Sequence, residues 1–390
     1  MTDPFMPLLR RGFDPVPDLA ERRIEQPVGK LEFPFGISAW LLTRHADVKQ
    51  VLGDVSGYSN DFARMNEAVA GQVPTVDPGG LGFADPPDHT RLRKLLTPEF
   101  TVHRLNRLKP RITAIVDERL DAVEAAGQPA DLVEEFAMPI PSLVMCELLG
   151  VPYEDRDVFQ TLSASRFDIF ANLDNPMGAI TESLAYLKGL VLQKRENPDD
   201  GLLGAIITSQ GDAITDDELA GLADGLLTGG HETTASMLSL GALMLTQRPD
   251  LADMLRAGEQ TEAIVDDLLR YMTVVQIAFP RFAREDTVIG GEHIAKGEMI
   301  LCSLSSADRD PDFVGEPDTV DPKQASTAHF AFGYGVHRCV GAELARIELR
   351  IAFPALVRRF PALRPALPLE QLEFRQYSIV HGLETLPMTW

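Results

Sequence analysis

The chain has 390 residues, 45% of them hydrophobic, and carries a formal net charge of −22 at pH 7. This length suffices for a large hydrophobic core, and the acidic balance argues against nucleic acid as a partner. Three scattered cysteines, no signal-peptide pattern and no run of about eighteen apolar residues predict a cytoplasmic protein without disulfides or a membrane span.

The first half of the chain is predicted to be mainly helical. Residues 1–35 are rich in proline and charge, and we expect irregular chain with short helices there. A strand is predicted over 38–43 and a helix over 46–52. From residue 90 to about 150 helical patterns dominate.

A long helix is predicted to begin at a capping box, in which Thr215 is the N-cap and Glu218 follows three residues later. Apolar spacing at helical period continues to about Thr246, and Pro249 follows its end. Thirty residues of helix span roughly 45 Å. Such a helix could cross the whole molecule.

The middle of this helix is a weak point, Gly229-Gly230-His231-Glu232-Thr233. Each glycine costs about 1 kcal/mol relative to alanine in a helix. We interpret the segment as a kink that opens the backbone ladder and leaves room for a small ligand, beside a carboxylate and a hydroxyl able to pass protons. The alternative is close packing of another element against the glycines.

Strands reappear after the helical region. Residues 280–306 contain Gly290-Gly291 between β-prone runs, which predicts hairpins. We therefore expect a mainly α fold with small β-sheets, in one domain over 1–390. Its β-rich region is drawn from about 30–60 and 275–330.

The ten residues 332–341 place one cysteine, Cys339, in a glycine-hinged loop just before a helical pattern. A helix N-terminus favours a thiolate, because its free N–H groups and macrodipole stabilise negative charge. A small buried cysteine is one alternative. A zinc site with His329 and His337 is another, but no Cys-x-x-Cys pair lies nearby to complete it.

Two motifs together resemble those of the cytochrome P-450 superfamily. The run Phe332-Gly333-Tyr334-Gly335-Val336-His337-Arg338-Cys339-Val340-Gly341 resembles its haem-binding loop, and Gly229 to Thr233 resembles its oxygen-activation motif. Residues 141–150 and 383–390 are typical of actinobacterial members. The resemblance implies the triangular helical haem-thiolate fold, with haem b as cofactor.

The resemblance also implies a role for individual residues. Cys339 would be the axial ligand of the iron, with Phe332 shielding the thiolate side. Thr233 would hydrogen-bond the bound dioxygen, and Glu232 would relay protons. The haem carboxylates would be held by His89, Arg93, Arg281 and His337. The remaining cofactor-binding residues implied are Gly229, Gly230, Gly333 and Gly341.

One internal anchor departs from the family pattern. The family has Glu-x-x-Arg on a helix, and this pair contacts an arginine later in the chain. Here Arg270 is present, but Asp267 replaces the glutamate. Gln324, next to Lys323, stands where the later arginine is expected. We predict that Asp267 still pairs with Arg270 or a neighbouring donor, and that Gln324 supplies neutral hydrogen bonds.

The implied activity is monooxygenation of a hydrophobic small molecule by hydroxylation or epoxidation, with electrons from a ferredoxin and its reductase. The basic segment 91–111 predicts a docking surface near Arg93, Arg104, Arg107 and Arg338, although a solvated helix face is the alternative. Other haem-thiolate classes also remain open: a peroxygenase, a coupling or isomerising catalyst, or a non-catalytic ligand-binding protein.

Substrate contacts are expected from apolar or unpatterned segments. Residues 55–88 and 165–185 lack periodicity, as binding loops often do. The individual residues expected to contact substrate are Leu226, Gly229, Val275, Gln276, Ala278, Ile379 and Val380. The sequence does not identify the substrate, the position oxidised, the ferredoxin or the oligomeric state.

Overall fold

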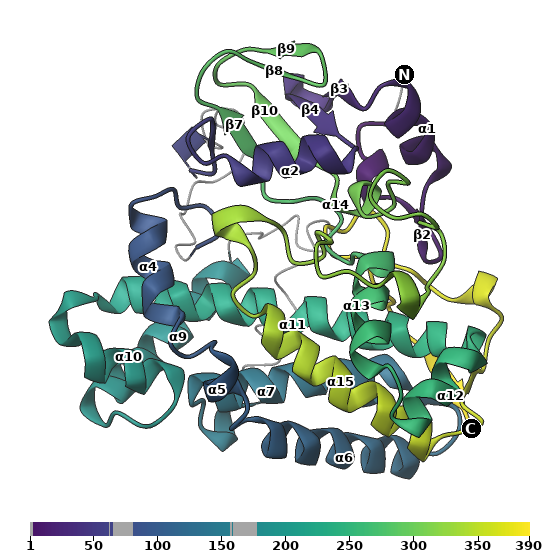
Figure 1. The fold of residues 1–390 in the computed structure, drawn as a ribbon. Coiled ribbons are helices and arrows are strands. Elements are labelled where there is room, and N and C mark those ends of the chain that lie inside the picture. The colour runs from purple at the N-terminus through teal and green to yellow at the C-terminus, as the bar shows by residue number, and fades with distance from the viewer. Residues whose placement is uncertain (1–2, 62, 65–80, 157, 159–177) are drawn as a thin grey trace.

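The computed structural model describes residues 3–61, 63–64, 81–156, 158 and 178–390. Helices form the body of the molecule, and a sheet lies at one end of it (Figure 1). The prediction of a mainly helical fold with small sheets is confirmed. Half of the predicted binding loop 55–88 (residues 62 and 65–80) and residues 165–177 of the second one lie outside the described residues. Residues 178–185 of the second one are helical, not a loop.

The helices are α1 (Pro17–Glu25), α2 (His45–Gly53), α4 (Asp88–Leu96), α5 (Val102–Leu105), α6 (Lys109–Ala126), α7 (Pro139–Leu149), α9 (Gly178–Glu196), α10 (Leu202–Gln210), α11 (Asp216–Gln247), α12 (Pro249–Ala257), α13 (Thr261–Met272), α14 (Leu304–Ala307) and α15 (Ala342–Arg359). Short 3-10 turns include η6 (Pro322–Gln324) and η7 (Gly335–His337), and η3 (Val133–Ala137) is π-helical. The strands are β1 (Arg10–Arg11), β2 (Asp14–Pro15), β3 (Val28–Glu32), β4 (Ser38–Leu42), β5 (Tyr58–Ser59), β6 (Ala130–Asp131), β7 (Arg281–Ala283), β8 (Thr287–Ile289), β9 (Glu292–Ile294), β10 (Met299–Cys302), β11 (Arg364–Pro365) and β12 (Pro387–Thr389).

The main sheet has the strand order β3-β4-β10-β7-β5. The hairpin predicted at Gly290-Gly291 is present, as the antiparallel pair β8 and β9. The rest of segment 280–306 is not simply hairpins, because β10 pairs antiparallel with β7 and parallel with β4. A parallel partner some 260 residues earlier (Met299 opposite Ala39) leaves no local signal in the sequence.

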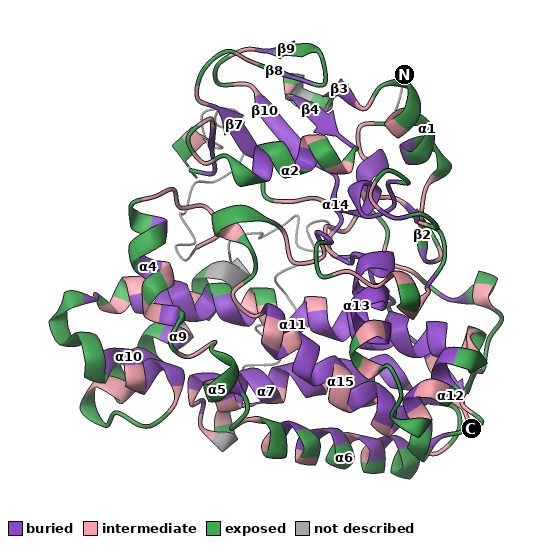
Figure 2. Cartoon of the chain, in the orientation of Figure 1, coloured by how far each residue is buried: buried purple, intermediate pink, exposed green. Residues whose placement is uncertain are grey.

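The predicted long helix is α11, and its capping box is present. The Thr215 hydroxyl accepts from the backbone N–H of Glu218 at 3.2 Å, and Glu218 Oε2 accepts from the backbone N–H of Thr215 at 3.0 Å. α11 packs against α7, α9 and α15, and most of its residues are buried (Figure 2). It therefore forms the centre of the helical body.

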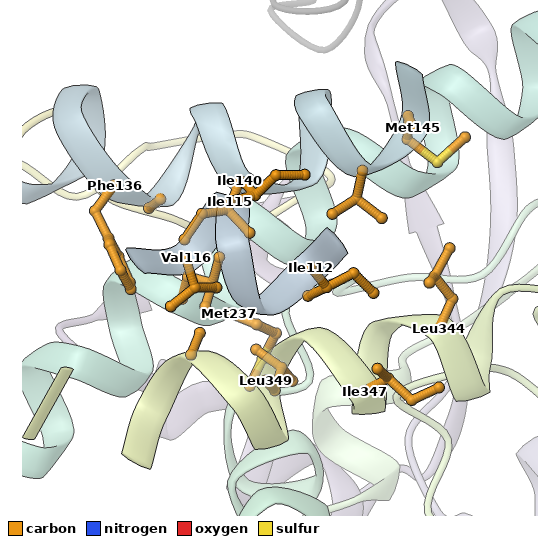
Figure 3. Close-up of a cluster of buried hydrophobic side chains, with 14 of the residues drawn as sticks. Ile112, Ile115, Val116, Phe136, Ile140, Met145, Met237, Leu344, Ile347 and Leu349 are labelled. Atoms are coloured by element: carbon orange, nitrogen blue, oxygen red, sulfur yellow. The ribbon is translucent and has the colours of Figure 1, made fainter. Parts of the chain in front are cut away.

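Apolar side chains of α6, α7, α11 and α15 meet in the largest core cluster. Figure 3 shows Ile112 and Val116 of α6 between α7, with Ile140, and α15, with Leu349. Met237 of α11 lies in the same cluster. α15 is therefore fixed along its length, which fixes the loop that leads into it.

The predicted ion pair between Asp267 and Arg270 of α13 is present, and so are the predicted neutral hydrogen bonds of Gln324. Arg270 Nε and Nη2 donate to the two oxygens of Asp267 at 2.6 and 3.2 Å, and both side chains are fully buried. Arg270 also donates to the carbonyl of Thr319 at 2.7 Å. The amide of Gln324 donates to the carbonyl of Glu316 at 3.0 Å, which holds the turn that carries Thr319.

Candidate active site

The loop before α15 is closed by its own backbone. The N–H of Cys339 donates to the carbonyl of Phe332 at 2.8 Å, and the N–H of Gly333 donates to the carbonyl of Phe330 at 2.8 Å. Cys339 lies three residues before the first residue of α15, as the sequence predicts.

Two glycines of this loop have left-handed backbones, with φ of +66° at Gly333 and +72° at Gly335. A Cβ at Gly335 would lie 2.3 Å from the carbonyl oxygen of Leu52 in α2, whereas at Gly333 the nearest atom would be 3.9 Å away. Glycine is therefore needed at position 335 for two reasons: its positive φ, and the close approach of α2, which leaves no room for a Cβ. This contact ties the cysteine loop to the element that flanks the sheet.

The surroundings of Cys339 favour a thiolate more than those of the other two cysteines. Burial raises the pKa of the Cys339 thiol, but the N–H of Gly341 and the guanidinium groups of Arg93, Arg338 and Arg346 oppose that rise. Burial raises the pKa of Cys146 and of Cys302 to about 12. Cys146 and Cys302 each have one arginine nearby that lowers the pKa, whereas Cys339 has three together with the N–H of Gly341.

The ring of Phe332 is held from α15. The guanidinium carbon of Arg346 lies 4.7 Å from the Phe332 ring centroid, and Arg346 Nε donates to Asp266 of α13 at 2.6 Å. His329 Nε2 lies 3.9 Å from the same Asp266 oxygen. The aromatic side chain before the cysteine is therefore fixed by a cation–π contact and a salt bridge behind it.

Four basic side chains predicted for haem carboxylates lie together. The rings of His89 and His337 are 4.2 Å apart between centroids, and Arg93 and Arg281 are close enough to lower the pKa of both histidines. Burial is the largest cause, and it takes the pKa of His337 to about 3. Arg281 donates to the side chain of Asn60 and to the carbonyl of Phe279.

This basic cluster fits the two carboxylates of haem b. Both ring nitrogens of His89 are buried and have no hydrogen-bond partner within the described part of the chain. Such donors, gathered with two guanidinium groups, match a ligand that brings its own anionic acceptors. By contrast, no group of three His, Cys, Asp or Glu side chains able to hold a metal ion occurs among the described residues, which counts against the zinc alternative.

The two central glycines of α11 differ in their surroundings. A Cβ at Gly229 would meet nothing within 4 Å, whereas at Gly230 it would lie 2.8 Å from Met145 Sδ. Gly229 and Gly225, which is also open, lie on one face with Thr233 at four-residue spacing. The predicted opening of the backbone ladder is wrong, since α11 is a continuous helix. The room comes from absent side chains instead.

Next to this open face, Glu232 is buried and accepts a hydrogen bond from Arg375 Nη1. His231 is also buried, with Nε2 3.0 Å from the Met138 carbonyl oxygen. Burial lowers the pKa of His231 to about 4, and it is therefore neutral near pH 7. The Thr233 hydroxyl donates to the carbonyl of Gly229 at 2.7 Å.

The expected substrate residues are only partly brought together. Val275 and Val380 form an antiparallel bridge, and the N–H of Gln276 donates to the carbonyl of Ile379 at 2.9 Å. The Gln276 side chain is fully buried, accepts from Arg10 and donates to the carbonyls of Leu8 and Ser378. We therefore assign Gln276 a structural role. Ala278 is half-buried, and Leu226 lies within the main core.

Three residues of the site carry no sequence signal that we recognised. Arg346 and Asp266 support Phe332, and Arg375 contacts Glu232. Arg346 follows Cys339 by seven residues on the predicted helix, so helical periodicity could have placed it near the loop. Arg375 lies in a segment without helix, 143 residues from its partner, and no local pattern could have found it.

Comparison with known proteins identifies the class. A family model described as "Cytochrome P450" matches residues 34–366. "Cytochrome P450 FAS1" of Rhodococcoides fascians is 40% identical, over 98% of this chain and 97% of its own length. "Vitamin D(3) 25-hydroxylase" of Pseudonocardia autotrophica is 39% identical, over 96% and 94%.

A solved structure agrees with these relatives. The chain resembles OxyC, described as a cytochrome P450 implicated in an oxidative C–C coupling reaction during vancomycin biosynthesis. The TM-score is 0.88 at 37% identity, and the match covers 98% of this chain and 96% of OxyC. Within the described residues, none of the helices has the length and apolar character needed to span a membrane.

Proposed function

The chain belongs to the cytochrome P450 family, and on that premise we propose that it inserts one oxygen atom of O2 into a hydrophobic small molecule, by hydroxylation or epoxidation. The reaction would be RH + O2 + 2 e⁻ + 2 H⁺ → ROH + H2O. The observation that carries the proposal is the open face of α11, which carries the Thr233 hydroxyl, with the buried carboxylate of Glu232 at the preceding position of the helix.

Haem b is the cofactor of the family, and when bound it supplies the iron at which dioxygen is activated. In our proposal, Cys339 ligates the iron as a thiolate, with the N–H of Gly341 directed at its sulfur. The ring of Phe332, fixed by Arg346, covers the thiolate side. His89, Arg93, Arg281 and His337 bind the haem carboxylates.

Proton delivery falls to Thr233 and Glu232. The Thr233 hydroxyl would turn from the Gly229 carbonyl to donate towards the open face, and Glu232 would replace the proton. Adjacent residues of a helix point about 100° apart, so their side chains do not face each other. A water molecule between the two is therefore part of the proposed route.

The test is oxidation under ¹⁸O2 with NADH, a ferredoxin and its reductase, across a library of hydrophobic compounds. We expect products that carry one ¹⁸O atom, and we expect Glu232→Gln to slow turnover. Thr233→Ser, which keeps the hydroxyl, is the matched control for Thr233→Val. Turnover that leaves every product without ¹⁸O would contradict oxygen insertion.

A ferredoxin is the proposed electron donor, docking beside the cysteine loop. Arg107 and Arg338 are exposed, Arg93 is half-buried next to Cys339, and no ion pair engages the three within the described residues. Arg104, also predicted for this surface, is paired with Glu99 at 2.7 Å. Since Arg93 is assigned to the haem carboxylates, an acidic partner would complement the exposed cations of Arg107 and Arg338.

Charge reversal tests this docking. Arg107→Glu should slow reduction by ferredoxin, and added salt should slow the wild type, since both weaken long-range attraction. Arg364→Glu is the matched control, because Arg364 is exposed beyond the other end of α15. A reduction rate that is indifferent to salt would contradict the proposal.

The proposed substrate contacts are Leu226 and Gly229 on α11, Val275 and Ala278 before β7, and Ile379 and Val380 near the C-terminus. All are apolar, which supports a hydrophobic substrate. We also propose a cytoplasmic location, since all three cysteines are free thiols and the proposed iron ligand must stay reduced.

Oxidative coupling is the second candidate. It is supported by the similarity to OxyC, which is as extensive as the similarity to the hydroxylase. Coupling would join two carbon atoms without oxygen insertion, so products would lack ¹⁸O and lose two hydrogen atoms. The same ¹⁸O2 experiment, read by mass spectrometry, therefore separates the two candidates.

A further inference from the structure

One guanidinium group lies between two carboxylates beside the proposed proton route. Arg375 donates to Glu232, whose side chain is 7% exposed, and Arg375 Nε lies 3.9 Å from Glu384 Oε2, whose side chain is 56% exposed. Arg375 itself is 16% exposed. A buried carboxylate and a solvated one thus share the same cation.

The backbone explains why Arg375 reaches both. The N–H of Arg375 donates to the carbonyl of Gly382, and the N–H of Glu384 donates to the carbonyl of Glu373, each at 2.9 Å. Phe374 is bridged antiparallel to the residue before Glu384. Arg375 and Glu384 are therefore diagonal neighbours on one face of a hairpin, within reach of long side chains.

The hairpin is held directly against α11. A Cβ at Gly382 would lie 2.6 Å from Ser236 Oγ, one helical turn after Glu232. The charge of Arg375 also lowers the pKa of His231, the residue before Glu232, although burial is the larger cause. Arg375 thus sits where it can hold the Glu232 carboxylate in one orientation.

A guanidinium group does not give up its proton in proteins. A carboxylate that accepts from Arg375 is also held in its charged form by the adjacent cation. While this ion pair persists, Glu232 neither takes up a proton readily nor turns freely. Proton uptake by Glu232 therefore requires Arg375 to move, and Glu384 offers it a second anionic partner.

We propose that Arg375 is a positioning residue that holds the charged Glu232, transfers to Glu384 when Glu232 takes up a proton, and returns once Glu232 has passed that proton on. The exchange replaces one ion pair with another, and no guanidinium is left uncompensated. The proposal rests on the proton-passing role of Glu232 proposed above. It adds two residues from the C-terminal segment to the site.

The holding role is tested without turnover, by infrared difference spectroscopy of the haem-loaded protein. Arg375→Gln removes the cation, and we expect Glu232 to become protonated, giving a carboxylic acid band absent from the wild type. The band should disappear in the Arg375→Gln/Glu232→Gln double variant and in Arg375→Lys, which keeps the charge. Failure of the band to appear, or its survival in the double variant, overturns the holding role.

A thermal-unfolding cycle gives independent support. Arg375→Gln and Glu232→Gln should each lower the midpoint temperature of thermal unfolding. The double variant should lower it by less than the sum of the two single effects, because the two side chains are in direct contact. Additive losses would overturn the pair. A loss of stability in any one variant does not affect this result. The measured quantity is the difference between the effect of the double variant and the sum of the two single effects.

The transfer is tested with Glu384→Gln, which removes the second partner. With a plant-type ferredoxin, its reductase and NADH at saturating concentrations, we expect slower NADH oxidation and a larger solvent deuterium isotope effect. Glu370→Gln, an exposed change in the same segment, should match the wild type. If Glu384→Gln has the rate and the isotope effect of the wild type, the transfer of Arg375 to Glu384 is wrong. If Glu232→Gln has the rate of the wild type, the proton-passing role of Glu232 is wrong, and the proposal that rests on it falls with it.

Discussion

The hydroxyl of Thr233 donates a 2.7 Å hydrogen bond to the carbonyl oxygen of Gly229, one turn earlier in α11. The bond satisfies the threonine donor within its own helix, and it places the hydroxyl oxygen beside a residue without a side chain. A Cβ at Gly229 would meet nothing within 4 Å. The open face of the central helix is therefore built from this pair.

Gly229→Ala should stabilise the protein and impair ligand binding. The added methyl group clashes with nothing, so the helix gains about 1 kcal/mol from the loss of glycine flexibility. The same methyl group enters the space beside Thr233, and we expect weaker binding of carbon monoxide to the reduced, haem-loaded protein. Titration with carbon monoxide and urea unfolding measure the two effects.

Gly225→Ala is the matched control, since Gly225 is equally open one turn before Gly229. It should give the same gain in stability and leave carbon monoxide affinity unchanged. Equal affinity in wild type and Gly229→Ala would show that the space beside Thr233 does not receive the ligand.

Gly335→Ala should cost the protein its haem. An alanine there requires φ of +72°, at a cost of roughly 1–2 kcal/mol, and its Cβ would lie 2.3 Å from the Leu52 carbonyl oxygen. The loop must move away from α2, and Cys339 moves with it. Haem content after purification, from the Soret absorbance per protein, measures the loss.

Gly333→Ala separates the two causes, because it has a similar φ of +66° but no close contact. We expect it to lose stability and to lose less haem than Gly335→Ala. Equal haem loss in both variants would mean that φ alone matters and that the contact with α2 does not.

Asp267→Asn should destabilise the fold by about 3–5 kcal/mol, because it leaves the fully buried Arg270 without its counter-charge. Asp250→Asn is the control: Asp250 pairs with Arg248 at 2.6 Å but is 53% exposed, and its loss should cost less than about 1 kcal/mol. Urea unfolding at neutral pH gives both values. Similar losses in the two variants would argue that the buried pair is not the anchor of α13.

Acid should destabilise the protein partly through His231. Burial lowers the pKa of this residue from 6.5 to about 4 in the folded protein. Between these values the unfolded chain binds the proton and the folded chain does not. The free energy of unfolding therefore falls as the pH drops from 6.5 towards 4, by up to about 1.4 kcal/mol per pH unit for this group.

The variant His231→Gln tests this directly, because glutamine can still donate to the Met138 carbonyl but does not titrate. Its free energy of unfolding should fall less steeply with acid than that of the wild type, with the other histidines common to both. Parallel pH profiles would show that His231 does not contribute.

The sequence by itself determined the features that depend on neighbouring residues. The capping box at Thr215 and the loop around Cys339 follow from local backbone requirements, and each is found where the pattern predicts it. The glycine pair at Gly229 marks an open face of the helix, although the helix there is continuous. A residue's dihedral preference and its hydrogen bonds within one turn are short-range properties. They can be inferred from a few letters of sequence.

Tertiary structure alone decided what those features face. The glycines Gly229 and Gly230 are alike in sequence, yet one opens onto free space and the other packs on Met145. Glu232 meets Arg375 across 143 residues of chain. Such contacts depend on how helices and hairpins pack, and packing is set by the sum of many distant interactions rather than by any local pattern.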